Sequence, residues 1–405
     1  MWGNSSWHTR CMADGAAVTR PKVRLGVIYA AHGASHAVVL VLPAVLISLR
    51  AEFGASFTTL GTVATVSSFL YGLGALPAGL LSDRFGPPQL LRLFAALSVV
   101  CCALAALAPG LWWLAAALAL LGAAGALYHP AGLAELTLTA PGRGRVLGLH
   151  GGAGNLGAAL TPLLAGAIAS AWSWRGSYLL AGLVVAVLFV ALRRGVPLDR
   201  ELPPPEHAGP PERNRAALWL VMFLAVAEGF IFQGFVTFLP AFLAEVGHFS
   251  HAAAAKGGAL SALVLLLGVP GQYLGGRLGE AGPRTLALRY AALYGGAAVV
   301  GQAVHWAGAS VLGVLLAGAF SVLIFLGQPL TNQLVARGTS AGRRGAAYGS
   351  YFSISLGIGA FAGTVGGVVA DHAGLAAVFG VLGVVAVVNV CGGLAIRALL
   401  AREPV

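Results

Sequence analysis

The chain has 405 residues, of which 58% are hydrophobic and only 9% are charged. A soluble protein of this length cannot bury so much apolar surface, so the composition excludes a soluble globular protein and indicates a lipid solvent. The formal net charge of +11 comes from basic residues scattered between apolar runs, so we expect no nucleic-acid partner. The four cysteines show no metal or disulfide spacing.

Along the chain, twelve apolar segments are long enough to cross a bilayer as helices. They lie at 25–49, 58–82, 89–109, 111–139, 146–171 and 176–193, and at 216–245, 256–279, 285–308, 309–337, 343–370 and 374–398. The proline-rich, charged stretch 194–215 separates the two sets and predicts a solvated linker. The pattern predicts an all-α polytopic membrane protein with tails at 1–24 and 399–405 and six-helix bundles at 25–193 and 216–398.

The basic residues predict the orientation of this bundle. With both termini placed in the cytoplasm, only Arg50, Arg175 and Lys256 fall on the outer side, and the other 21 of the 24 basic residues fall on the inner side. Such an excess of positive charge is typical of the cytoplasmic side of a membrane protein. We therefore expect a multi-pass protein of a cell membrane, the bacterial inner membrane in particular.

The two halves repeat each other. Matching pairs are Leu42-Pro43 with Leu239-Pro240, His129-Pro130 with Gln328-Pro329, Arg143-Gly144 with Arg344-Gly345, and Gly86-Pro87 with Gly282-Pro283. Their offsets are 197, 199, 201 and 196 residues. Six helices per half give both copies the same orientation, and parallel repeats of this kind place a substrate site between them near the bilayer midplane.

The stretch from Gly79 to Gly86, Gly-Leu-Leu-Ser-Asp-Arg-Phe-Gly, resembles the signature loop between the second and third helices of the major facilitator superfamily. A weaker copy follows in the second half at 275–283. Tyr128-His129-Pro130, the glycine-rich run from Gly148 to Gly157, and Trp174-Arg175 are similar to the fosmidomycin-resistance and related drug-exporter branch. The resemblance implies two parallel six-helix repeats and transport by alternating access.

Polar residues inside the predicted helices are costly in a bilayer and are candidate functional groups. His32 and His36 are four residues apart, on one face of the first helix. The superfamily resemblance implies that helices one, four, seven and ten line a central cavity. Their candidates for substrate binding or proton coupling are His32, His36, Tyr128, His129, Glu228, Gln233, Gln328 and Asn332. His150 and Tyr351 either shape the pathway or pack between repeats.

We expect a secondary active transporter that moves a small solute, with proton-coupled export of a drug or organic anion as the specific hypothesis. Glu228, with His36 or His129, would bind the protons. The alternative is a transition-metal transporter with His32, His36, His129 and Glu228 as ligands. The sequence lacks a nucleotide-binding loop and a nucleophile constellation, so we expect neither a cofactor nor an enzyme, and we expect a monomer.

A conformational gate is expected at the cytoplasmic side. Its residues are Gly79, Asp83, Arg84, Gly86, Arg143 and Arg145, with Glu135 in the same network. Asp371 and His372 are expected in a loop on the other side of the membrane.

Overall fold

The computed structural model describes residues 21–139, 144–197, 215–246, 252–339 and 344–401, and within these ranges every regular element is helical. The first half contains α1 (Pro21–Ala44), α2 (Leu46–Phe53), α3 (Phe57–Leu73), α4 (Ala75–Phe85), α5 (Pro87–Ala106), α6 (Leu111–Ala126), α7 (Tyr128–Thr139), α8 (Gly144–Ala171) and α9 (Trp174–Gly195). The second contains α10 (Arg215–Ala244), α11 (Ala253–Leu278), α12 (Pro283–Ala307), α13 (Val311–Gly338), α14 (Arg344–Phe352), the π-helical turn η2 (Ser353–Ile358), the 3₁₀ turn η3 (Gly359–Phe361), α15 (Ala362–Ala373) and α16 (Leu375–Ala401).

These helices confirm the predicted fold class. Within the described residues, eleven helical stretches are long and apolar enough to cross a membrane. The predicted segment 285–308 is α12, which is more polar because it carries Arg289, Gln302 and His305. Its 25 residues still give a length of about 37 Å, more than the thickness of a hydrocarbon core of about 30 Å.

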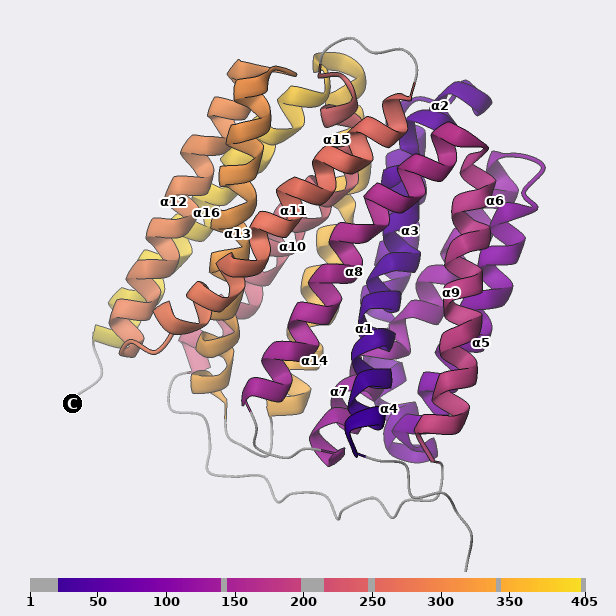
Figure 1. Cartoon of the computed structure of the whole chain (residues 1–405). Helices are drawn as coiled ribbons and strands as arrows, with labels where there is room; N and C mark the ends of the chain where they lie inside the picture. Colours follow the sequence, from indigo (N-terminus) through magenta and orange to yellow (C-terminus); the bar gives the residue numbers. More distant parts are fainter. Residues whose placement is uncertain (1–20, 140–143, 198–214, 247–251, 340–343, 402–405) are drawn as a thin grey trace, which may run out of the picture.

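The bundle has two distinct sides, which Figure 1 shows at the bottom and the top of the view. We call the side on which α1 begins and α16 ends the terminal side, and the other the opposite side. The chain passes from the first half to the second on the terminal side, between the end of α9 and the start of α10. Most of the predicted tails and linker, at 1–20, 198–214 and 402–405, lies outside the described residues.

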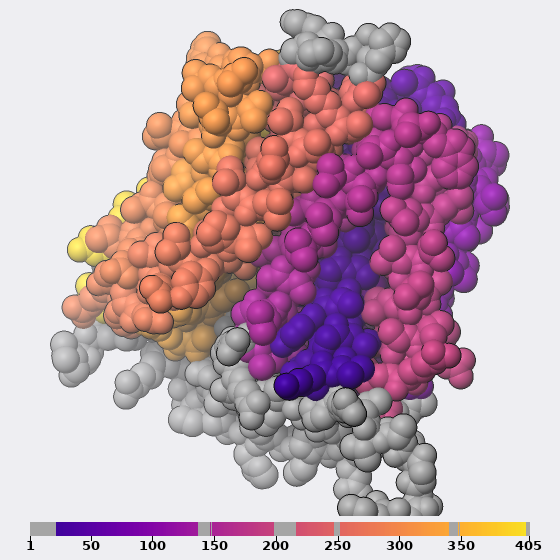
Figure 2. Space-filling model, viewed as in Figure 1, coloured from indigo at the N-terminus to yellow at the C-terminus, as the bar shows by residue number. Residues whose placement is uncertain are grey.

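The two halves pack together mainly through two helix pairs, which the internal repeat relates to each other. Helix α8 of the first half packs along α11 of the second, and α3 packs along α15. Helix α1 contacts α10, and α4 contacts α14. Figure 2 shows the surfaces of α8 and α11 meeting on the face in view.

Several predicted spans are interrupted. The first bends at Val45, two residues after Pro43, and the second breaks at Gly74. The fourth breaks at Leu127, so that Tyr128 and His129 occupy the first turn of α7. The eleventh contains η2, whose wider turn breaks the regular helical register. Single π-helical turns of this kind occur frequently at functional sites.

Glycines allow helix backbones to approach closely inside each half. A Cβ atom added to Gly157 of α8 would lie 2.2 Å from the backbone oxygen of Gly33 on α1. Small residues at such contacts stabilise membrane bundles through close van der Waals packing. The contact holds α1 and α8 together, and both helices carry site residues.

We expect Gly157→Ala to lower the free energy of unfolding by about 1–3 kcal/mol, because α1 and α8 must separate. The thermal unfolding midpoint of the detergent-solubilised protein measures the effect. The matched control is Gly152→Ala on the same helix, where a Cβ would meet nothing within 4 Å. Equal unfolding midpoints for the two variants would contradict this account of the packing.

Candidate functional site

Four histidines of the first half form one cluster, which we call the histidine cluster: His32, His36, His129 and His150. One ring nitrogen from each of His32, His36 and His129 lies within 4.8 Å of the other two. The ring of His150 stacks on that of His32, with 3.9 Å between the ring centroids. The structure therefore brings together the three histidines predicted from α1 and α7 and adds a fourth from α8.

Hydrogen bonds determine the tautomer of neutral His32. Its Nδ1 lies 2.6 Å from the backbone oxygen of His150, which can only accept, so Nδ1 donates. The lone pair on Nε2 of His32 then faces Nε2 of His36 at 3.2 Å, and His36 donates. One hydrogen bond with a defined direction thus joins His36 to His32.

Tyrosines hold the other two imidazoles. Tyr128 donates to the backbone oxygen of Ile28, so its own oxygen accepts from Nε2 of His150 at 2.9 Å. The hydroxyl of Tyr71 on α3 lies 2.6 Å from Nε2 of His129. His36 and His129 are half-buried, whereas His32 is buried.

Glycines of α8 make room for this cluster. A Cβ on Gly154 would lie 2.5 Å from the ring of His32. The glycine-rich run that suggested the drug-exporter branch thus provides the surface against which His32 and His150 stack.

Glu228 of α10 occupies a separate pocket in the second half. Thr331 of α13 donates to Oε1 at 2.6 Å, and Tyr351 of α14 donates to Oε2. The hydroxyls of Tyr290 and Tyr294 on α12 also face the carboxylate. We call Glu228, Tyr290, Tyr294, Thr331 and Tyr351 the carboxylate pocket.

No arginine, lysine or histidine of the described ranges forms an ion pair with Glu228. The side chain is buried, with 7% of its surface exposed. Glu228 is also not one of the residues whose ligand atoms meet at the histidine cluster, so the structure does not bring the predicted four-ligand metal set together. An isolated buried carboxylate is costly, and here the hydroxyls of Thr331 and Tyr351 stabilise it in place of a cation. The Tyr290 hydroxyl donates its own hydrogen to Oδ1 of Asn389.

The last two residues of α14, directly before η2, connect the two sites. Tyr351, which binds Glu228, precedes Phe352, whose ring stacks on His129 at 6.0 Å between centroids. A Cβ on Gly229 would lie 1.8 Å from the backbone oxygen of Ser355, so α10 and η2 touch directly beside Glu228. A change in the position of Tyr351 at Glu228 can therefore move the adjacent Phe352, which contacts His129.

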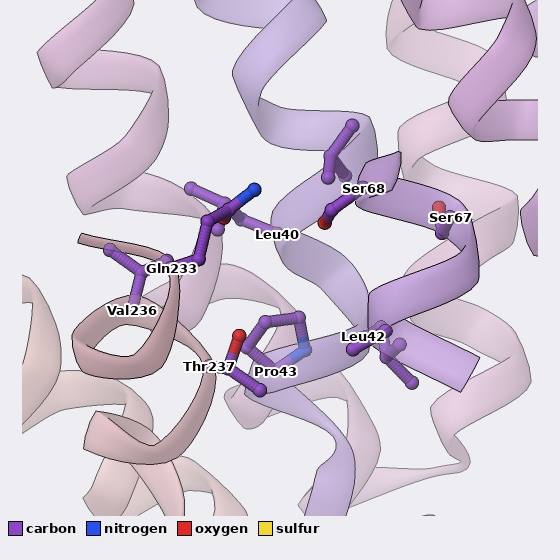
Figure 3. A pocket seen from close by; sticks show the side chains of 10 residues that line it. Leu40, Leu42, Pro43, Ser67, Ser68, Gln233, Val236 and Thr237 are labelled. Atoms are coloured by element: carbon purple, nitrogen blue, oxygen red, sulfur yellow. The ribbon is translucent and has the colours of Figure 1, made fainter. Parts of the chain in front are cut away.

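The predicted amides lie around these sites. Gln233 lines a small cavity of about 10 Å³ between α1, α3 and α10, together with Pro43, Ser67 and Ser68 (Figure 3). Gln328 accepts from Gln272 of α11 at 2.6 Å. Asn332 is half-buried on α13, beside Thr331. A cavity of this size holds about one water molecule.

The predicted gate residues Gly79, Asp83, Arg84 and Gly86 lie on the terminal side, in α4 and directly after it. Gly86 has a φ of 87°, which a residue with a side chain rarely adopts, and it makes the turn between α4 and α5. Asp83 and Arg84 are exposed, and Asp83 has no hydrogen-bond partner among the described residues. Gly79 faces Pro130 of α7. Arg143 lies outside the described residues, as does the side chain of Arg145.

Sequence reasoning missed several groups. Tyr290 and Tyr294 lie in a predicted helix, 285–308, that carries none of the predicted site residues. The one available signal is their spacing of four residues on one helical face. Asp371, expected in a loop, instead belongs to α15, where it accepts hydrogen bonds from the first half. Glu135 binds Arg24 of α1, with 2.6 Å from Nε to Oε1.

Relatives of the chain are transporters. It is 24% identical to the fosmidomycin resistance protein of Escherichia coli over 397 residues, which cover 90% of this chain and 92% of that protein. It is 26% identical to a probable sulfoacetate transporter of Cupriavidus necator over 254 residues, 57% of this chain and 58% of that one. A bacterial homologue of the lysosomal transporter Spinster has a similar fold, with a TM-score of 0.73 at 15% identity, covering 95% of this chain and 99% of the other.

The model of the Major Facilitator Superfamily matches residues 26–364 of the sequence. This match spans both halves and, with the helical fold, indicates a transporter and not an enzyme. The chain belongs to the Major Facilitator Superfamily.

Proposed function

We propose that this secondary transporter exports a small drug or organic anion in exchange for protons. Glu228 carries the proton, and the solute binds between the halves at the histidine cluster. The observation that carries the proposal is the carboxylate pocket: a buried carboxyl group with hydroxyl donors and, among the described residues, no cation.

Such a pocket suits reversible proton binding. An ionised carboxylate at membrane depth needs a cation, and a proton is the cation that a solvent-connected carboxyl group exchanges most readily. The hydroxyls of Thr331 and Tyr351 can accept as well as donate, so they can stabilise Glu228 with or without its proton. The pocket changes its charge without losing its hydrogen-bond partners.

Coupling to the solute follows the path through the end of α14, directly before η2. Release of the proton changes the hydrogen bond from Tyr351, and the neighbouring Phe352 stacks on His129. His36, His129 and the amides of Gln233 and Gln328 then offer donors to an anionic group. The relatives named for fosmidomycin and for sulfoacetate support a small solute of this class.

We place the terminal side in the cytoplasm, on the strength of the charge asymmetry. The gate residues Gly79, Asp83, Arg84, Gly86, Arg143 and Arg145 then act at the cytoplasmic entrance. The two halves, 25–193 and 216–398, rock as units about the site, and a single chain suffices for this motion.

A transition-metal ion is a second candidate cargo. The two Nε2 atoms of His32 and His36 are 3.2 Å apart. Two nitrogen ligands of a tetrahedral zinc ion at about 2.0–2.1 Å are separated by about 3.3 Å. His129 would supply a third ligand, and the carboxylate pocket would take no part.

We expect Glu228→Gln to abolish the dependence of fosmidomycin efflux on a pH gradient, because the amide cannot exchange a proton. Exchange of internal for external fosmidomycin should continue. Both are measured with radiolabelled fosmidomycin in proteoliposomes. Glu245→Gln is the control, since it makes the same chemical change at an exposed carboxylate beyond the end of α10. Gradient-driven efflux that persists in Glu228→Gln would contradict the assignment of Glu228 as the proton carrier.

The two candidate cargoes predict different results for His36→Ala. We expect its KM for fosmidomycin to rise about tenfold, the effect of losing one charge-assisted hydrogen bond, and we expect no zinc flux in the wild type. Both are measured in proteoliposomes, the second with an internal zinc-sensitive dye. A saturable wild-type zinc flux that disappears in His36→Ala and persists in Glu228→Gln would establish the metal as cargo.

A further inference from the structure

On the opposite side, hydrogen bonds join the two halves directly. Asp371 at the end of α15 accepts from the backbone nitrogens of Phe57 at 2.9 Å and Thr58 at 2.8 Å, and from the Thr58 hydroxyl at 2.7 Å. On the terminal side, arginines bind within their own half, as Arg284 does with the backbone oxygen of Leu400 and Arg337 with that of Ala281.

Asp371 completes the N-terminus of α3. A helix leaves its first four N–H groups without partners in its own backbone. In α3, Ser56 accepts from Thr59 through its side chain and from Leu60 through its backbone. The remaining two N–H groups, of Phe57 and Thr58, both bind Asp371, which lies more than 300 positions away in the other half. A carboxylate at this end also interacts favourably with the helix dipole.

The equivalent contact exists at the other interface between the halves. Ser170 at the end of α8 accepts from the backbone nitrogen of Ala255, in the first turn of α11, at 2.9 Å. Ser170 and Asp371 are 201 positions apart, and Phe57 and Ala255 are 198 apart. Both offsets fall within the 196–201 range of the internal repeat.

Close glycine contacts follow the same symmetry. A Cβ on Gly61 would lie 2.1 Å from the backbone oxygen of Gly363, and a Cβ on Gly166 would lie 3.4 Å from the Cα of Gly258. Both Gly61 with Gly258 and Gly166 with Gly363 are separated by 197 positions. Each half thus contributes one helix whose N-terminus is capped, α3 or α11, and one side chain that caps the helix of the other half, Ser170 or Asp371.

We propose that Asp371 and Ser170 are positioning residues of the transport cycle, a pair of symmetry-related capping contacts that hold the opposite side closed. Opening that side separates α15 from α3 and α8 from α11, and water must then replace both caps. An open hollow of about 570 Å³ lined by Arg50, Ser56 and Asp371 gives water access to the first contact.

The two contacts differ in strength. Asp371 is charged and makes three hydrogen bonds, whereas Ser170 is neutral and makes one. Charged hydrogen bonds are about twice as strong as neutral ones. The Asp371 contact is therefore the stronger of the two capping contacts. This proposal rests on the alternating-access part of the proposed function and on neither its cargo nor its proton coupling.

The test measures access to the small cavity behind the contacts. Ser68 lines that cavity and is buried, so we introduce Ser68→Cys into a full-length chain whose four native cysteines are replaced. A membrane-impermeant maleimide is applied to intact cells and, separately, to inside-out vesicles. The labelling rate from the side of Asp371 reports how often that side opens.

We expect Asp371→Ala to raise this rate about fivefold to thirtyfold, the range typical for the loss of a helix cap. Asp371→Ser, which copies the other contact, should give an intermediate rate. Ser170→Ala should raise the rate less than Asp371→Ala, and Ser170→Thr should match the wild type. His372→Ala is the control, because His372 is exposed and binds only within its own helix.

Ser170→Asp separates the proposal from general loosening of the fold. It places a carboxylate at the N-terminus of α11, as Asp371 does at α3, and should slow labelling below the wild-type rate. The proposal is overturned if Asp371→Ala labels at the wild-type rate, or if Ser170→Asp labels faster. Neither result depends on whether fosmidomycin is transported, so failure of the proposed cargo is distinguishable.

Discussion

The position of the turn η2 depends on backbone contacts at two glycines, and much of the site depends on that turn. Gly229 of α10 touches Ser355 of η2, and Gly72 of α3 touches Gly357 at the other side of the turn. A side chain at either glycine would separate η2 from one half of the protein. The turn follows directly after Tyr351 and Phe352, so these contacts also determine how the carboxylate pocket meets the histidine cluster.

The functional groups are divided between the halves by chemistry. The first half contributes four imidazoles, and the second contributes a carboxylate surrounded by hydroxyls. Hydrogen bonds stabilise each set, as polar groups inside a bilayer require. Because Phe352 of the second half stacks on His129 of the first, relative motion of the halves changes the surroundings of both sets at once. This arrangement links the proposed proton site to the proposed solute site without a direct bond between them.

Much of the fold could be predicted because a bilayer allows few solutions: apolar runs of sufficient length become helices, and the repeat and the family signature supply the architecture. The candidate positions of His32, His36, His129 and Glu228 followed from the cost of polar groups at membrane depth. The tyrosines around Glu228 could not be predicted in the same way, because Tyr290 and Tyr294 occur in a sequence where tyrosine is also an ordinary core residue. The role of Asp371 depends on a helix end more than 300 residues away, and no local pattern encodes that contact. The π-helical turn is likewise set by packing against Gly72 and Gly229.

In the proposed exchange, solute and proton move in opposite directions through the same protein, each at its own site. This exchange is tested most directly by imposing a fosmidomycin gradient across proteoliposomes that contain the wild-type protein, with equal pH on both sides and a pH-sensitive dye inside. Exchange predicts that outward flow of fosmidomycin drives protons inward, so the lumen acidifies as the solute leaves, and a protonophore removes the acidification. Outward flow of fosmidomycin with an unchanged internal pH would contradict the account.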